Sequence, residues 1–241
     1  MQAAVAGLIL LALCAAPAAA GPWGRERGGG FASVSRTGDD SSLWVEYGLG
    51  RRLTLLADVG GSGHARHGAL MLHREFGAPG RNQRFAATLG VAAGPDGRGG
   101  REAGLRVGLS LGAGIGGFDP AGAAQRLPLL GTPLRKGLAR IGIDGPVPGW
   151  VALDTHAEAG RNHRRMKAEA TLGLKPHPRL MTVFQLQGEA VRRPWGAARS
   201  LHAQPSVVWQ ARDGLHLELG LRQRLDGQGA RQLRLGSWLE F

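Results

Sequence analysis

The sequence predicts an all-β chain that folds as an antiparallel, transmembrane, up-and-down β-barrel of about twelve strands. From residue 31 onward, segments of roughly ten residues alternate apolar and polar side chains between turn residues such as Gly, Pro, Asn and Asp. After residue 20 there is no run of about 18 apolar residues, so any membrane-spanning part must consist of strands. The last segment, 231–241, alternates Leu with polar side chains and ends on Phe241.

The composition excludes most other classes. Among 241 residues there are 41 Gly and 13 Pro, and aromatic residues make up 5%, which is poor material for one large soluble core. A large β-sandwich and a barrel in lipid remain. The apolar face of the segments is Leu, Val and Ala almost without charge, and the ionisable residues share the other face. This division favours lipid outside and a polar lumen inside.

Residues 1–20 have the features of a Sec signal peptide. An apolar run is followed by small residues that fit a cleavage site after Ala20, although no Lys or Arg precedes the run. Cleavage removes Cys14, the one cysteine, and leaves a thiol-free chain suited to an oxidising envelope. We therefore expect a signal peptide over 1–20 and a single barrel domain over 21–241.

The expected strands are short, regular and even in number, as bacterial single-chain barrels require. The segment 215–225 shows the pattern well, because its Leu residues oppose His216, Glu218 and Arg222. In chain order the strands span approximately residues 30–36, 41–49, 52–60, 67–77, 83–93, 101–112, 149–159, 164–175, 179–192, 200–211, 215–225 and 231–241.

Two sequence motifs typical of catalytic or cofactor-binding sites occur in the chain, but the residues around them do not predict the local structure that such sites need. Residues 108–112 match G-x-S-x-G and residues 112–117 match G-x-G-x-x-G, yet no helical pattern follows either one. Asp154, His156 and Glu158 share one strand face and could meet a cation, but membership of a lumen salt-bridge network explains them better. We therefore assign no catalytic, cofactor-binding or metal-binding residue.

With its signal peptide, its alternating strands and Phe241, the chain resembles the small outer-membrane β-barrels of Gram-negative bacteria. The resemblance implies Sec export, residence in the outer membrane and insertion by the barrel assembly machinery, which reads the last strand; Trp238 and Phe241 are the expected assembly signal. It also implies that both termini and the short turns are periplasmic. Five outward aromatic residues then form a periplasmic girdle: Tyr47, Phe76, Phe85, Trp209 and Phe241.

One connection does not fit this scheme. Residues 113–148 form a long Gly- and Pro-rich link on the side where turns should be short. Shorter links are expected at 48–52, 175–179 and 211–214, and looser ones at 60–67 and 192–201. The long link is expected to occlude the periplasmic mouth in part, to hang free, or to conceal a further hairpin.

The distribution of charged residues predicts which side chains line the lumen and which partners the protein contacts. The candidate lumen charges are Glu46, Asp58, Arg106, Asp154, His156, Glu158, Lys167, Glu169, Glu218, Arg222, Arg224 and Arg234. The net charge of +12 resides mainly in Arg-rich connections, which indicates contact with outer-membrane lipid and the phosphates of lipopolysaccharide. Export argues against nucleic acid as a partner.

Three functions remain open at this stage. The first is a non-enzymatic barrel, either a narrow passive pore or a structural envelope protein with a charged lumen. The second is an outer-membrane barrel enzyme that modifies or hydrolyses lipid. The third is a soluble periplasmic β-sandwich that binds a ligand.

Overall fold

A computed structural model of the chain describes residues 22–63, 66–77, 82–96, 98–119, 136, 146–227 and 229–241. The expected signal peptide, 1–20, and most of the long connection lie outside these residues. Within the described part, no helix is long and apolar enough to cross a membrane.

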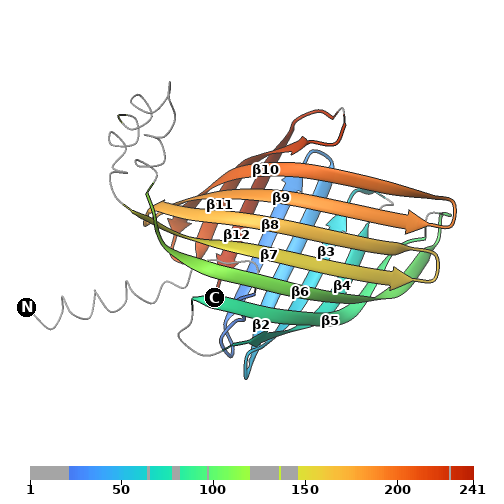
Figure 1. Ribbon diagram of the computed structural model, residues 1–241, viewed down its shortest axis with the longest axis horizontal. Coiled ribbons are helices and arrows are strands. Elements are labelled where there is room, and N and C mark those ends of the chain that lie inside the picture. Colours follow the sequence, from blue (N-terminus) through green and yellow to red (C-terminus); the bar gives the residue numbers. More distant parts are fainter. Residues whose placement is uncertain are drawn as a thin grey trace, which may run out of the picture.

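Twelve antiparallel strands form one closed sheet, in which each strand pairs with its neighbours in sequence and β1 pairs with β12 (Figure 1). The strands are β1 Gly30–Thr37, β2 Asp40–Gly50, β3 Leu53–Gly61, β4 His67–Phe76, β5 Gln83–Pro95, β6 Arg101–Phe118, β7 Val147–Gly160, β8 Arg164–His177, β9 Leu180–Arg193, β10 Gly196–Arg212, β11 Leu215–Arg224 and β12 Gln232–Glu240. The prediction of an antiparallel up-and-down barrel is confirmed. A soluble β-sandwich is wrong, because the sheet has no free edge.

Two connections differ from the sequence prediction. β6 continues to Phe118 and β7 begins at Val147, so both strands extend into the region expected to be a link over 113–148. The loose link expected over 192–201 is instead a two-residue turn at Pro194 and Trp195, with β9 and β10 in unbroken register up to the Arg193–Gly196 pair. The Gly and Arg residues of this stretch suggested a loop, but the backbone pairing of β9 with β10 continues through them.

The two ends of the barrel are distinct. We call the end at which β1 begins and β12 ends the termini end, and the opposite one the distal end (Figure 1). At the distal end, β1–β2 and β9–β10 are joined by two-residue turns. The described distal links are all short, so little of the chain projects beyond the strands there.

Arg51 and Arg52 form the turn between β2 and β3, and both have positive φ, 52° and 63°. A two-residue hairpin of this kind normally uses Asn or Gly, because left-handed backbone is costly for other residues. Arg52 is held by contacts with β4 and its link: its guanidinium donates to the carbonyl oxygen of Gly77, and its own carbonyl accepts from the Glu75 amide at 3.0 Å. Arg51 is exposed and strained.

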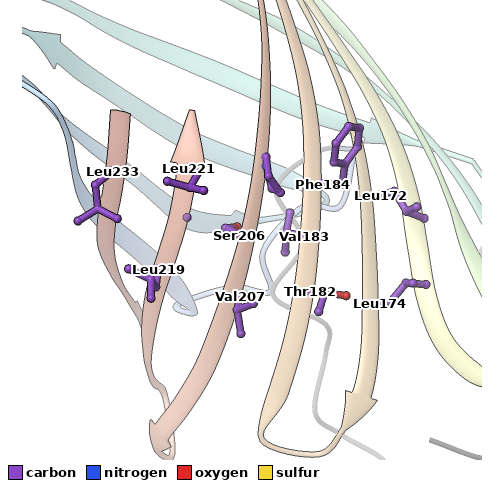
Figure 2. A pocket seen from close by; sticks show the side chains of 12 residues that line it. Leu172, Leu174, Thr182, Val183, Phe184, Ser206, Val207, Leu219, Leu221 and Leu233 are labelled. Atoms are coloured by element: carbon purple, nitrogen blue, oxygen red, sulfur yellow. The ribbon is translucent and has the colours of Figure 1, made fainter. Parts of the chain in front are cut away.

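The outer face of the barrel is apolar along most of its length. Large side chains on the outward parity are exposed, including Leu89, Leu109, Leu219 and Leu235. Figure 2 shows one part of this face, where residues such as Leu172, Phe184 and Leu219 from neighbouring strands line a shallow groove. The side chains of opposite parity point into the barrel.

Candidate functional site

The barrel interior is crossed by an ion pair between strands that are not neighbours. Arg106 on β6 donates to Asp58 on β3 at 2.8 Å, although β4 and β5 lie between them in the sheet. Such a contact can form only through the interior. Arg106 also donates to Glu158 on β7 at 2.8 and 3.1 Å, and both Arg106 and Glu158 are buried.

This network extends towards the distal end. His163, in the turn after β7, contacts the other oxygen of Glu158 at 2.7 Å and also contacts Glu102 on β6. The backbone amide of Asn162 donates to Glu102 at 2.9 Å. The chain of contacts from Asp58 to Glu102 therefore fastens the β7–β8 turn against the inner wall, and Arg106 lies at its centre.

A second network is built on Glu169 of β8. The Gln185 and Gln187 side-chain amides donate to its two carboxylate oxygens at 2.6 and 3.0 Å, and Gln204, 2% exposed, donates to Gln185 at 2.6 Å. Asp154 lies directly opposite Glu169 in the register. The hydrogen bonds to this carboxylate therefore come from side-chain amides and the Thr171 hydroxyl, a pattern that the sequence analysis did not predict.

The remaining predicted lumen charges gather in three places. Lys167 and His156 are cross-strand partners, and the His156 Nδ1 is buried without a hydrogen-bond partner. Arg234 donates to Glu218 at 3.0 Å, and Trp238 donates to the other Glu218 oxygen at 3.2 Å. These contacts lie on β7–β8 and on β11–β12.

Arg222 and Arg224 on β11 complete the set at the distal end. Arg222 approaches His202 at 3.5 Å and has a buried Nε without a partner, whereas Arg224 donates to Asp226 at 2.9 Å. The interior near this end therefore contains guanidinium groups that are less fully paired than Arg106.

Two apolar clusters also occupy the interior. One joins Trp150, Ala152, Met181, Val183 and Val208 of β7, β9 and β10. The other joins Leu56, Ala69, Met71 and Ala92 of β3 to β5, with Trp44 packed against it. Leu56 and Met71 have the parity of the polar, inward-facing residues of their strands. This departure from the alternation was the sequence feature that could have predicted an apolar cluster in the interior. The lumen is thus partly filled rather than uniformly charged.

The segment before β1 enters the barrel, which the sequence did not reveal. Trp23 packs against the first apolar cluster, on β7, β9 and β10, and Pro22 is fully buried. Two residues later the Arg25 amide donates to Thr54 at 2.9 Å, and the Arg25 guanidinium donates to Glu46 at 2.6 Å. Because Thr54 and Glu46 belong to β3 and β2, residues 22–25 span the interior from one wall to the other.

The inner wall makes room for this segment at two glycines. A Cβ at Gly112 of β6 would lie 2.6 Å from both Pro22 and Trp23, and a Cβ at Gly48 of β2 would overlap the carbonyl oxygen of Glu26. The Gly24 amide donates to Glu75 at 3.0 Å, and Glu75 is paired with Arg84 at 2.9 Å. Residues 22–26, which we call the inner segment, are therefore held by backbone hydrogen bonds, by the Arg25–Glu46 ion pair and by the space that the two wall glycines leave.

The five aromatic residues expected to form a girdle are exposed on the outward parity towards the termini end. Phe76 and Phe85 are cross-strand partners with ring centroids 5.8 Å apart. The other three are Tyr47, Trp209 and Phe241. Trp238, the other residue of the expected assembly signal, points into the barrel and packs edge-on against Phe31, with ring centroids 6.1 Å apart.

Within the described residues, no group of three or more His, Cys, Asp or Glu side chains is arranged to hold a metal ion. His156 faces the lumen rather than the outer wall. The interior therefore presents paired charges, side-chain amides and two apolar clusters, and the inner segment lies across the termini end.

These features define a closed, twelve-stranded antiparallel β-barrel. The chain is similar in structure to the KdgM porin, with a TM-score of 0.58 and 8% identity over 88% of this chain and 99% of that one. It is also similar to the NanC porin, with a TM-score of 0.53 and 6% identity over 88% of this chain and 99% of that one. No family model matches the sequence. No curated protein matches it either. At these identities the likeness concerns the fold.

Proposed function

We propose that this protein is an outer-membrane barrel that acts as a narrow passive pore, restricted by its own inner segment. The apolar outer face supports a position in lipid, since every backbone group of a closed barrel is paired and the exposed Leu and Val side chains need no water. The five aromatic residues at the termini end suit the membrane interface, and this end would be periplasmic. Sec export by the segment 1–20 is part of the same proposal.

The main support for a restricted pore is the path of the inner segment through the barrel. Trp23 touches β7, β9 and β10 while Arg25 touches β2 and β3, so the segment lies across the termini end of the lumen. Deeper inside, the Asp58–Arg106–Glu158 pairs narrow the passage again. Solutes would therefore pass slowly unless the inner segment moves aside.

The preferred solute would be a small anion. Exposed arginines gather at the distal links and strand ends, where they favour the approach of negative charge: Arg36, Arg66, Arg98, Arg101, Arg161, Arg164, Arg192, Arg199 and Arg231. Asp39, Asp40, Asp96 and Asp226 oppose them in smaller number. The KdgM porin has been solved in complex with disordered oligogalacturonate, an acidic chain, which is consistent with anion passage through a barrel of this fold.

Planar-bilayer conductance tests the proposal. We expect small, anion-selective currents from the purified barrel and clearly larger ones from the double variant Trp23→Ala, Arg25→Ala, which loses the contacts of the inner segment with both walls. Arg27→Ala is the matched control, because Arg27 is exposed in the same stretch. Equal currents from wild type and double variant would contradict the restriction. If neither the wild type nor the double variant conducts, a structural role in the envelope is favoured over a pore.

Location is tested separately by heat-modifiability. A closed barrel in detergent should migrate faster on a denaturing gel before boiling than after it, and the protein should fractionate with outer membranes. Release into the soluble fraction without a shift would contradict membrane residence. Recognition of β12 by the barrel assembly machinery, through Phe241 above all, is the remaining part of the proposal.

A further inference from the structure

The outer wall over β7 to β9 has a groove near its distal end. Most outward side chains there are small, namely Thr155 and Ala157 on β7, Ala168 on β8 and Ala190 on β9, with Gly188 beside them, and Met166 of β8 is the large exception. Leu109 on β6 and Leu201 on β10 rise on either side. The groove encloses about 640 Å³ and is almost wholly apolar.

Three arginines stand on the outer face at the distal edge of this groove, and one of them, Arg199, belongs to its lining. Arg164 and Arg192 are cross-strand partners on β8 and β9, and Arg199 on β10 lies opposite Ala190 of the groove. All three are exposed and share the outward parity. Arg164 is two residues beyond Met166, which also lines the groove, so its Cα lies about 7 Å further along the wall.

Among the residues that the structure describes, no carboxylate is paired with this arginine group. Like charges placed directly opposite each other on one face of a sheet are destabilising, yet no ion pair joins Arg164, Arg192 or Arg199 to an acid of the described residues. The neighbouring acids are engaged elsewhere: Glu189 faces inwards to Arg165 at 3.1 Å, and Asp226 accepts from Arg224. That hydrogen bond also lowers the pKa of the Asp226 carboxyl, which keeps it ionised.

From this arrangement we infer that the β7–β9 wall binds one phosphorylated, acylated lipid of the lipid A type, with a phosphate on Arg164, Arg192 and Arg199 and an acyl chain in the groove below. The planar fork of Arg matches phosphate oxygens in pairs, and one phosphate between Arg164 and Arg192 would relieve their repulsion. The groove in Figure 2, on β8 to β12, has no charged residue in its lining and is the natural comparison.

The inference rests on the proposed position of the barrel in the outer membrane, and it is independent of pore activity. A barrel that stays heat-modifiable but binds no lipid would contradict the lipid site alone. Loss of heat-modifiability would instead contradict the membrane barrel itself.

Binding is measured by native mass spectrometry of the detergent-purified full chain titrated with bisphosphorylated lipid A. We expect one retained lipid for the wild type and a loss of affinity of roughly tenfold or more for Arg164→Gln, Arg192→Gln, since each charge-assisted contact contributes about that factor. Arg36→Gln, Arg66→Gln makes the same change in net charge at exposed distal residues elsewhere and should bind as the wild type does.

The groove is tested by filling it. Ala168→Phe, Ala190→Phe occupies the acyl site from the outer face without entering the lumen and should also weaken retention, whereas Ala87→Phe, on the outward parity of β5, should not. Dephosphorylated lipid A should bind weakly. Equal binding of that lipid, displacement of lipid A by millimolar inorganic phosphate, or unchanged binding by the double Arg variant would each overturn the inference.

Discussion

Gly30 and Phe241 complete the seam of the barrel. The Gly30 amide donates to the Phe241 carbonyl oxygen at 2.6 Å, and the Phe241 amide donates to the Gly30 carbonyl oxygen at 3.1 Å. The Phe241 ring covers Gly30 so closely that a Cβ there would overlap it. The terminal residue therefore pairs with the start of β1 while its ring remains largely exposed on the outer face, at 62%.

Deletion of Phe241 should lower the free energy of unfolding by about 1–3 kcal/mol, because two backbone hydrogen bonds and the ring contact are lost together. The measurement is the urea midpoint of heat-modifiability for protein refolded in detergent. Phe241→Leu keeps the backbone pair and should lose less. If deletion leaves the midpoint unchanged, the seam does not depend on this residue.

Arg106→Gln should destabilise the barrel by up to about 3 kcal/mol, because it leaves the Asp58 and Glu158 carboxylates in the interior without their cation. Changing all three residues to uncharged ones, Asp58→Asn, Arg106→Met, Glu158→Gln, should recover much of that loss. Thermal unfolding followed by tryptophan fluorescence compares the two. A triple variant no more stable than Arg106→Gln would show that charge isolation is not the cause.

Arg51→Asn should stabilise the β2–β3 turn by about 1 kcal/mol, since Asn tolerates the left-handed backbone that Arg51 adopts at a φ of 52°. Arg51 is exposed, so no interior contact changes with it. The urea midpoint reports the gain. Arg36→Asn, at an exposed strand position without positive φ, is the matched substitution and should bring no such gain.

Gly112→Val should displace the inner segment and raise the conductance of the pore, because any Cβ at this position meets Pro22 and Trp23. Gly94→Val is the control: Gly94 also faces inwards, and a Cβ there would make an ordinary contact with His67 at 3.5 Å. Single-channel recordings distinguish them. Currents that rise equally in both variants would point to a general loosening of the wall.

Arg192→Gln should raise the thermal stability of the barrel in detergent without lipid A and should lower it, relative to the wild type, when lipid A is bound. In zwitterionic detergent the variant should be more stable than the wild type, because the Arg164–Arg192 repulsion is removed. With bisphosphorylated lipid A present, the wild type should be the more stable of the two. The same order in both conditions would contradict bridging by an anion.

The strand pattern and the direction of side chains followed from the sequence because alternation repeats over the whole chain. Leu215, Leu217 and Leu219 stand outwards while His216 and Glu218 point inwards, as period two requires. Strand ends were less predictable. Residues 196–199 look like a loop by composition, and their place in β10 depends on pairing with β9 across a turn that only the register reveals.

The interior was harder to predict for a physical reason. Which inward residues meet depends on the curvature and stagger of the closed sheet, so the contact of Asp58 with Arg106 cannot be read from either strand alone. The inner segment carries no alternation at all. A single Trp in a Gly-rich stretch, Trp23, was the one local sign that these residues pack against something.

The position of the inner segment bears on the order of folding. Trp23 lies close in sequence to β1, yet it packs against the cluster that contains Trp150 and Val208, well over a hundred residues away. Contacts of such separation form late, because long loops must close first. The burial of Trp23 therefore reports when strands up to β10 have assembled, and the fluorescence difference between wild type and Trp23→Phe during refolding would give the rate of that step.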